Sequence, residues 1–324
     1  MINGFQISQA IHVAAVLGIA DLLKDGPRSN DQLALATSTN PATLYRLLRA
    51  LASVGVFEEV AGKTFALNPL SQALRTDRPD SIAAWAVLIG QEYFWNAWGN
   101  LLTGIKTGEN VFPQLHDGMG VWEYRETRPE LNAIFNAAMT SSSRGVSASV
   151  VQAYDFSQFK LIVDVGGNRG ALLAAILTAN PSARAINFDQ PHVVSDADLA
   201  AAGVADRCEL VGGSFFESVP SGGDAYVMKS IIHDWTDEES IEILKVCRKA
   251  MSPPAKLLVI EQVVGQPNEG TATKFSDLNM LALPGGRERT KEEFTQLFEQ
   301  SGFRLTRVAS PGPDTYCVIE GVPV

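Results

Sequence analysis

The segment Leu161-Ile162-Val163-Asp164-Val165-Gly166-Gly167-Asn168-Arg169-Gly170 decides the fold of this chain. A short run of strand-forming residues leads into a glycine-rich turn, and a helical pattern begins at Ala171. Such a turn between a first strand and a helix lets a ligand approach the backbone closely. The segment therefore predicts an α/β domain that binds a nucleoside cofactor at this turn.

Strand and helix patterns alternate from this segment to the C-terminus. Further strand patterns cover residues 185–188, 208–211, 225–228, 257–261, 303–308 and 316–320, and helical patterns cover residues 171–179, 237–251 and 291–301. Strands separated by helices predict a mostly parallel sheet that is covered on both faces. Only residues 309–315 separate the last two strands. This gap is too short for a helical crossover and predicts an antiparallel last strand.

The N-terminal half of the chain has a different pattern. The spacing of apolar residues predicts helices over residues 7–23, from Asp31 after a cap at Ser29 or Asn30, and from Pro41 to Gly55. Two short strand patterns, 56–60 and 64–67, complete a winged-helix pattern, and a third helical block rich in aromatic residues extends over residues 81–149. We therefore divide the chain into a mainly helical winged-helix domain, residues 1–153, and an α/β domain, residues 154–324.

The composition is that of an acidic globular protein. Of 324 residues 46% are hydrophobic, and 26 basic against 36 acidic residues give a formal charge of −10. This balance disfavours nucleic acid and anionic membranes as partners. The three cysteines form no CxxC pair, which excludes a disulfide framework, argues against a bound metal and favours the reduced cytoplasm. We expect no targeting segment, and the apolar run 13–19 is too short to span a membrane.

Two classes of cofactor use a glycine-rich turn of this kind. The dinucleotide fingerprint G-x-G-x-x-G, placed from Gly166, has Asn168 where its middle glycine belongs. The acidic-x-G-x-G-x-G template of S-adenosylmethionine enzymes fits at Asp164, Gly166 and Gly170, and asparagine tolerates positive φ at the remaining position. Asp189 ends the second strand pattern, where it could accept hydrogen bonds from ribose hydroxyls or instead cap a following helix.

Three motifs carry a family resemblance. They are Phe188-Asp189-Gln190-Pro191-His192-Val193-Val194, Met228-Lys229-Ser230-Ile231-Ile232-His233-Asp234-Trp235 and Gly285-Gly286-Arg287-Glu288-Arg289-Thr290, and Leu44-Tyr45-Arg46-Leu47-Leu48-Arg49-Ala50-Leu51 agrees with them. Together they resemble the S-adenosylmethionine-dependent O-methyltransferases of the plant caffeic-acid type and their bacterial small-molecule relatives. The resemblance covers nearly the whole chain. It implies a Rossmann-like class I methyltransferase domain that follows a winged-helix dimerisation domain, in a homodimer.

The resemblance also implies roles for individual residues. The cofactor S-adenosylmethionine would be held by Gly166, Asp189, Ser214, Phe215 and Lys229. His233 would be the catalytic base, flanked by Glu261 and Glu288. The acceptor, a small hydroxylated aromatic molecule of secondary metabolism, would be lined by Phe135, Met139, Asn279 and Met280. The chain departs from the family pattern at Asn168-Arg169, where a glycine and its neighbour are usual, and at Ser214, where aspartate is usual.

The strand pattern brings a base and a carboxylate together independently of the resemblance. Methyl transfer mainly needs alignment of nucleophile, methyl group and leaving sulfur, but a neutral hydroxyl must also lose its proton. Histidine can accept that proton near neutral pH. His233 follows the strand pattern 225–228 and Glu261 ends the next one, so both lie at the carboxyl edge of the sheet, where ligands bind. A carboxylate beside an imidazole fixes its tautomer and stabilises its charged form.

The sequence leaves other functions open. The winged helix could bind DNA through residues 41–54, although this helix offers only Arg46 and Arg49 as cations. An NAD-dependent oxidoreductase would lack the middle glycine of its fingerprint. The same fold could methylate nitrogen or catalyse a non-methylating reaction, and retention of His233 favours an oxygen acceptor.

Single residues also have alternative interpretations. Phe135 and Met139 have the i, i+4 spacing of core residues as well as of a pocket. Asp234 could be catalytic or could hold its loop. Glu288 could pair with a neighbouring arginine on the surface instead of with His233.

Overall fold

The computed structural model of the protein describes residues 2–78, 80–312 and 315–324. The chain forms two compact units, Met1–Asn96 with Arg125–Ser142, and Ala97–Tyr124 with Ser143–Val324. The two units interleave along the chain, because helices α7 (Glu92–Gly99), α10 (Val121–Glu126) and α11 (Pro129–Ala153) each contribute residues to both. The division of the chain after residue 153 stays a prediction about its domains.

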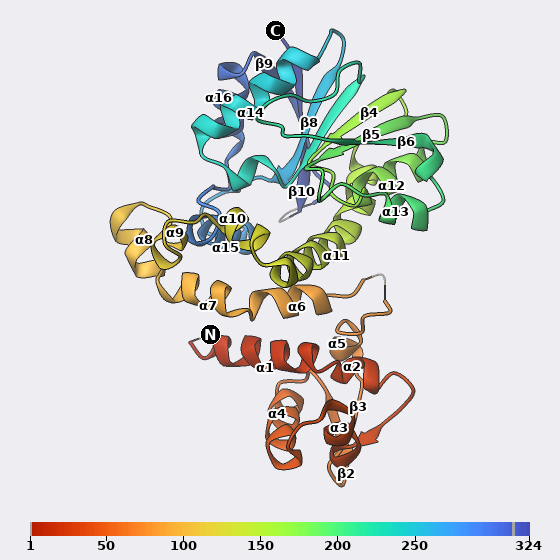
Figure 1. Ribbon diagram of the computed structural model, residues 1–324, viewed down its shortest axis with the longest axis vertical. Helices are drawn as coiled ribbons and strands as arrows, with labels where there is room; N and C mark the ends of the chain where they lie inside the picture. The colour runs from red at the N-terminus through yellow and green to blue at the C-terminus, as the bar shows by residue number, and fades with distance from the viewer. Residues whose placement is uncertain (1, 79, 313–314) are drawn as a thin grey trace. The chain divides into compact units, whose positions relative to one another are not determined.

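The first unit contains a winged helix. Its elements are α1 (Gly4–Val16), α2 (Ile19–Leu22), β1 (Arg28–Ser29), α3 (Asn30–Thr37), α4 (Pro41–Ser53), β2 (Glu58–Ala61), β3 (Thr64–Ala66), α5 (Pro69–Gln72) and α6 (Ala83–Ile89). The three strands pair in the order β1-β3-β2, and α3 packs on α4 (Figure 1). The helix predicted over residues 7–23 is divided, because Gly18 has a φ of +63°, which glycine adopts at little cost.

The helix starts of this unit follow the capping rules. The Ser29 side chain accepts a hydrogen bond from the backbone N–H of Gln32, whose side chain bonds back in a capping box at the start of α3. Asn40 caps α4, with Pro41 in its first turn. The buried core of the unit includes Leu33, Leu48 and Phe65. Burial of these apolar side chains fixes the helices against the small sheet.

The second unit contains a seven-stranded sheet. Its elements are α8 (Leu101–Thr107), α9 (Phe112–Leu115), β4 (Leu161–Val165), α12 (Ala171–Ala179), β5 (Arg184–Asp189), α13 (Ala197–Ala201), η1 (Ala205–Arg207), β6 (Cys208–Gly212), β7 (Ala225–Lys229), η2 (Ile232–Asp234), α14 (Asp237–Ala250), β8 (Lys256–Gln262), α15 (Thr271–Ala282), α16 (Lys291–Gln300), β9 (Phe303–Ala309) and β10 (Tyr316–Pro323). The strand order is β6-β5-β4-β7-β8-β10-β9. Strands β6, β5, β4, β7 and β8 pair in parallel, and β10 pairs antiparallel with both β8 and β9. The predicted parallel sheet with an antiparallel last strand is confirmed.

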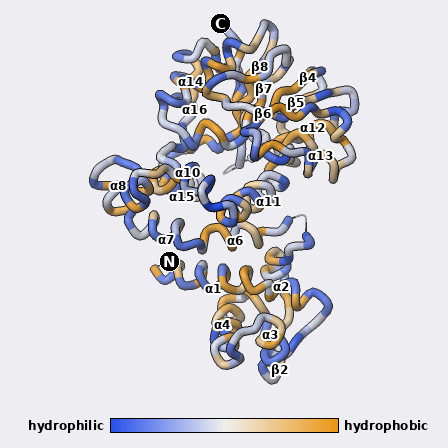
Figure 2. The backbone as a smooth tube through the Cα atoms, viewed as in Figure 1, coloured by the Kyte–Doolittle hydropathy of each residue, from blue (hydrophilic) through white to orange (hydrophobic). Residues whose placement is uncertain are grey.

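Alternate residues of the strands face two different cores. Val163 and Tyr226 belong to the core shared with α14 and α16, and Ile162 and Val227 belong to the core shared with α12. Figure 1 shows α14 and α16 on one side of the sheet and α12 and α13 on the other. The central strands are hydrophobic along their length, as Figure 2 shows. Burial on both faces explains these apolar runs and leaves the carboxyl ends of the parallel strands for polar residues.

No helix among the described residues is both long enough and apolar enough to cross a membrane.

Candidate active site

The glycine-rich loop between β4 and α12 needs its glycines for backbone and packing reasons. Gly166 and Gly170 have φ values of +82° and +80°, and Asn168 has a φ of +49°. Asparagine is one of the few residues that tolerate this conformation, so the chain keeps the loop shape where the family usually has glycine. A Cβ atom on Gly167 would lie 2.0 Å from Oδ1 of Asn187, so no side chain fits there.

Asp189 and Asn187, both on β5, form hydrogen bonds with the backbone of this loop. Oδ2 of Asp189 accepts a hydrogen bond from the backbone N–H of Asn168 at 2.9 Å, and its Oδ1 accepts one from Gln190 at 2.7 Å. Nδ2 of Asn187 donates to the carbonyl of Asn168 at 3.0 Å. Burial raises the pKa of Asp189 and the two backbone hydrogen bonds oppose this shift. No helix follows Asp189 directly, so its interpretation as a helix cap is wrong.

The departure at Arg169 is held by a buried carboxylate. Asp198 is only 6% exposed, and its backbone N–H donates to the carbonyl of Arg169 at 3.1 Å. The Asp198 carboxylate pairs with the guanidinium of Arg144, on α11, and lies 3.9 Å from Nε of Arg169. Two arginines therefore compensate one buried charge beside the loop.

Asp164 and Lys229 lie beside the glycine-rich loop, and burial shifts their pKa values in opposite directions. Burial raises the pKa of Asp164 to about 7, although the ammonium group of Lys229 lowers it. Burial lowers the pKa of Lys229, and the carboxylate of Asp164 opposes this. Nζ of Lys229 lies 3.3 Å from Oγ of Ser230, which in turn donates to the hydroxyl of Tyr316 at 3.1 Å. Ser230 has a φ of +55°, a strained conformation of the kind found at functional sites.

Ser214 and Phe215 follow β6 at the same sheet edge. Oγ of Ser214 accepts a hydrogen bond from the backbone N–H of Phe216 at 3.3 Å, so it stabilises its own turn. The rings of Phe215 and Trp235 pack edge to face, with centroids 6.0 Å apart. Phe215 thus offers a half-buried aromatic surface at the carboxyl edge of the sheet.

The residues at this edge fit the chemistry of S-adenosylmethionine. That molecule carries a ribose diol, a purine ring, an ammonium group and a carboxylate. Asp189 could accept hydrogen bonds from ribose hydroxyls, Phe215 could pack on a purine, and Asp164 and Lys229 could supply one charge of each sign. The three positive-φ positions of the loop bring backbone close to a ligand.

His233 lies in the single turn η2 after β7, and its side chain is buried. Its Nδ1 lies 3.0 Å from Oε1 of Glu288, and its Nε2 lies 3.7 Å from Oδ1 of Asp234. Burial lowers the pKa of His233, but the carboxylates of Asp234, Glu288 and Glu261 outweigh this effect and raise it to about 10. The carboxylates therefore stabilise the imidazolium form of this ring.

Glu261, at the end of β8, supports the backbone of this turn. Its Oε1 accepts hydrogen bonds from the backbone N–H groups of Ile231 at 3.2 Å and His233 at 3.0 Å. Its Oε2 is buried and has no hydrogen-bond partner among the described residues. Burial raises the pKa of Glu261 to about 7, against the opposing effect of His233. Glu261 thus positions the histidine through the main chain.

Glu288 is part of a hydrogen-bonded chain that includes α15. It is 3% exposed, and its Oε1 accepts a hydrogen bond from Oγ of Ser276 at 2.7 Å. Its backbone N–H donates to Oδ1 of Asp277 at 2.9 Å. The alternative of a surface pair with a neighbouring arginine is therefore wrong.

Arg289 is buried beside the turn that carries His233, a place that the sequence did not predict. It is 1% exposed, and its guanidinium donates to the carbonyls of Ile232 and Trp235, each at 3.0 Å. It also pairs with Asp237 at 2.7 Å. Its planar group of donors binds both ends of the turn that carries His233. A buried arginine is rare, but only its place in the motif 285–290 could have indicated it from the sequence.

The residues expected to line the acceptor lie on two helices. Asn279 and Met280 are on α15, and Oδ1 of Asn279 accepts a hydrogen bond from the indole N–H of Trp98 at 3.0 Å. Phe135 and Met139 are on the part of α11 that belongs to the first unit. The Phe135 ring lies under the guanidinium of Arg125, which is 3.8 Å from the ring centroid. The role of all four residues stays a prediction. The described residues contain no cluster of histidine, cysteine, aspartate and glutamate that could hold a metal ion.

Comparison with known proteins places the chain in a family. The family described as O-methyltransferase domain matches residues 98–304, and the O-methyltransferase dimerisation domain matches residues 1–77. A phenazine O-methyltransferase from Lysobacter antibioticus is 44% identical over 326 residues, which cover 100% of this chain and 95% of the relative. A mitomycin biosynthesis 6-O-methyltransferase from Streptomyces lavendulae is 39% identical, with 99% and 92% covered.

Another relative and two solved structures extend the comparison. An 8-amino-8-demethylriboflavin N,N-dimethyltransferase from Streptomyces davaonensis is 33% identical, with 97% of this chain and 91% of the relative covered. The crystal structure of LaPhzM has a TM-score of 0.95 and 43% identity, with 100% and 97% covered. An O-methyltransferase from neocarzinostatin biosynthesis, solved with S-adenosylmethionine and 2-hydroxy-5-methyl naphthoic acid, has a TM-score of 0.81 and 29% identity, with 98% and 96% covered. The protein belongs to the S-adenosylmethionine-dependent O-methyltransferase family and is an enzyme with S-adenosylmethionine as its cofactor.

Proposed function

We propose that this enzyme methylates a hydroxyl group of a small aromatic metabolite and that His233 is the general base. The observation that carries the proposal is the 3.0 Å contact between Nδ1 of His233 and Oε1 of Glu288. This contact holds Nδ1 and leaves Nε2 as the nitrogen that can take a proton from the acceptor.

The protein residues would act on the acceptor and its proton. When bound, S-adenosylmethionine supplies an electrophilic methyl group. Gly166, Asp189, Ser214, Phe215 and Lys229 would hold the cofactor at the carboxyl edge of the sheet. Nε2 of His233 would accept the hydroxyl proton, and the carboxylates around the ring would stabilise the resulting imidazolium.

The aromatic character of the acceptor is supported by the relatives. The matched enzymes include a phenazine and a mitomycin O-methyltransferase, and one neighbour was solved with a naphthoic acid. Phe135, Met139, Asn279 and Met280 would line the acceptor site. The test is turnover of labelled S-adenosylmethionine by the purified protein with a panel of phenols. Transfer of label to no phenol in the panel would reject an aromatic hydroxyl as the acceptor.

N-methylation is the second candidate, because one relative is an N,N-dimethyltransferase. A neutral amine carries a free lone pair and needs no base before attack. The two functions differ in the response to His233→Ala. An amine acceptor would keep most of its rate in this variant, whereas a phenol of high pKa would lose it.

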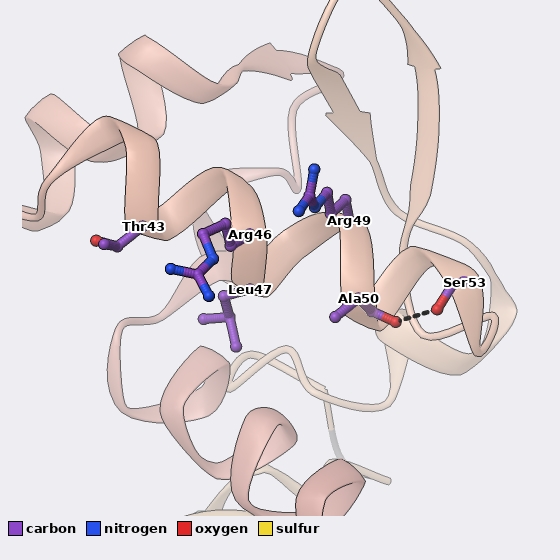
Figure 3. Close-up of a pocket in the computed structure, with 6 residues that line it drawn as sticks. All are labelled: Thr43, Arg46, Leu47, Arg49, Ala50 and Ser53. Atoms are coloured by element: carbon purple, nitrogen blue, oxygen red, sulfur yellow. Dashed lines mark hydrogen bonds between the residues drawn. The ribbon is translucent and has the colours of Figure 1, made fainter.

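The remote alternative of DNA binding depends on α4. Figure 3 shows that a shallow hollow on this helix is lined by Thr43, Arg46, Leu47, Arg49, Ala50 and Ser53. The guanidinium of Arg49 lies 5.5 Å from the ring centroid of Tyr45, which engages one of the two cations. Two arginines are few for a surface that neutralises phosphates. A gel-shift assay at low salt tests this alternative.

We also propose a homodimer in the cytoplasm. The dimerisation domain matched over residues 1–77 supports the assembly. Helix α1 and the segment before it expose several large apolar side chains: Ile2, Phe5, Ile7, Val13 and Val16. Such a surface favours a second copy as its cover. Three free cysteines agree with a reducing compartment.

A further inference from the structure

The amide of Asn279 has a fixed orientation. The indole N–H of Trp98, on α7, donates to Oδ1 of Asn279, on α15, at 3.0 Å, and both side chains are half-buried. An indole N–H can only donate, so the amide must turn its oxygen toward Trp98. Its NH2 group then points elsewhere, and among the described residues Nδ2 of Asn279 has no hydrogen-bond partner. Trp98 thus leaves the NH2 group of Asn279 as a donor that pairs with no other described residue.

This donor lies close to the catalytic hydrogen-bonded chain. Ser276, three residues before Asn279 on α15, donates to Glu288 at 2.7 Å, and Glu288 contacts His233 at 3.0 Å. Residues three apart share one face of a helix, so the Asn279 side chain lies on the same face as that of Ser276, about 4.5 Å further along the helix axis. Asn279 thus lies on the helix whose preceding turn contacts the hydrogen-bonded chain of His233.

We propose that Trp98 determines acceptor specificity by fixing Asn279 as a donor. The preferred acceptor then carries a hydrogen-bond acceptor beside the hydroxyl that is methylated: a carbonyl oxygen, a carboxylate or a ring nitrogen. This inference rests on the proposed function, because it assumes that the hydroxyl lies at His233. A ligand that leaves a desolvated donor unpaired binds less well than one that pairs it.

Two compounds of the same shape form a suitable probe. 8-Hydroxyquinoline has a ring nitrogen beside its hydroxyl, and 1-naphthol has a C–H group there. The ratio of their kcat/KM values, measured with saturating S-adenosylmethionine, reports the preference. The difference in their intrinsic reactivity cancels when the wild-type ratio is divided by the ratio of a variant. We expect the wild-type ratio divided by the ratio of Asn279→Leu to favour 8-hydroxyquinoline by about tenfold, the factor of one neutral hydrogen bond.

Three variants distinguish the effect of the orientation of the Asn279 amide from the effect of its presence. Asn279→Asp keeps the shape but replaces the NH2 group by a carboxylate oxygen, so the preference should reverse in favour of 1-naphthol. Asn279→Leu should abolish it. Trp98→Phe keeps the ring but removes the N–H donor, so the amide can rotate and the preference should fall by several-fold. A purely structural role of Trp98 would lower both kcat/KM values equally and leave their ratio unchanged.

The outcomes separate this inference from the proposed function. Methylation of both compounds with equal ratios in the wild type, Asn279→Asp and Trp98→Phe would overturn the inference and leave the proposed function intact. Binding of both compounds, measured by quenching of tryptophan fluorescence with S-adenosylhomocysteine present, should show the same preference if a variant is too slow to assay. If neither compound binds or is methylated, the proposed acceptor class fails, and the inference fails with it.

Discussion

Nδ1 of His233 lies 3.0 Å from Oε1 of Glu288, and both side chains are buried. The contact has two consequences for the proposed role of His233 as general base. It selects the tautomer in which Nε2 accepts the proton, and it raises the affinity of the ring for that proton. A base with a raised pKa is a strong base, but less of it is neutral at pH 7. The carboxylates around His233 would therefore make it a stronger base while they decrease the fraction of it that is neutral at pH 7.

His233→Ala should lose about 10²- to 10⁴-fold in kcat, the usual contribution of general-base catalysis. The loss should be largest for phenols of high pKa, since an ionised phenolate needs no base. The affinity for S-adenosylmethionine, measured by calorimetry, should stay close to that of the wild type. His192→Ala is the matched control, because His192 is exposed and should tolerate the change. Near-full activity of His233→Ala on a phenol of high pKa would exclude this residue as the base.

The pH dependence should follow the raised pKa of His233. Only the neutral imidazole accepts a proton, so kcat/KM should rise with pH, with an inflection above the ordinary 6.5 and toward the value of about 10. Glu288→Gln removes a negative charge, lowers the pKa of the ring and should move the inflection to lower pH. Glu261→Gln should move it less, because Glu261 contributes less to the raised pKa. A profile that is flat from pH 6 to 9, for a phenol that stays neutral, would contradict the base assignment.

Asp189→Asn should weaken the binding of S-adenosylmethionine. The carboxylate accepts hydrogen bonds from the backbone N–H groups of Asn168 and Gln190, and it would also bind the ribose. A charge-assisted hydrogen bond contributes about 1.5–3 kcal/mol, so the dissociation constant should rise roughly ten- to a hundredfold. Asp196→Asn is the control, because Asp196 is exposed in the loop that follows. Calorimetry with equal affinities for both variants would remove Asp189 from the cofactor site.

The proposed dimer predicts the effect of a charge on α1. Light scattering of the wild type should give twice the chain mass of 34.9 kDa. Val16 is 56% exposed at the end of α1, and Val16→Asp should shift the protein toward the monomer, because a carboxylate is costly in an apolar interface. Leu210→Lys, on the edge strand β6, changes an exposed apolar residue of the second unit and should leave the mass unchanged. A wild type that is monomeric at micromolar concentration would contradict the proposal.

The strands were the most predictable part of the fold. The run Leu161–Val165 is β4 as expected, because central strands buried on both faces must be apolar throughout. The antiparallel β10 also followed from the sequence, since seven residues cannot hold a crossover helix. Its insertion between β8 and β9 could not be predicted, because pairing partners are chosen by side-chain packing far apart along the chain.

The sequence indicated which residues belong to the candidate site, but it did not indicate which of their atoms contact one another. The ends of β7 and β8 place His233 and Glu261 at one sheet edge, as the strand pattern indicated. The pattern could not show that the carboxylate of Glu261 binds the backbone of the turn while Glu288 binds the ring. These hydrogen bonds depend on side-chain rotamers and on the path of the loop that follows α15. Neither leaves a periodic pattern in the sequence. The same limit hid Arg289, which looks like a surface charge in the sequence.

Arg289→Lys should test how far the turn that carries His233 depends on a buried guanidinium. Lysine keeps the charge but lacks the planar set of donors that reaches the carbonyls of Ile232 and Trp235 together. At least one buried carbonyl would lose its partner, so the free energy of unfolding should fall by about 1–3 kcal/mol. Because the turn carries His233, kcat should fall more than the affinity for S-adenosylmethionine.

Arg248→Lys is the matched control for this prediction. Arg248 also donates to backbone carbonyls of the second unit, those of Gly302 and Val324, but these belong to the C-terminal segment and not to the turn that carries His233. It should lose stability with kcat unchanged. Thermal unfolding and steady-state kinetics on both variants separate the two effects. If the two arginine variants lose stability equally and both keep the wild-type kcat, Arg289 stabilises the fold but does not position the base.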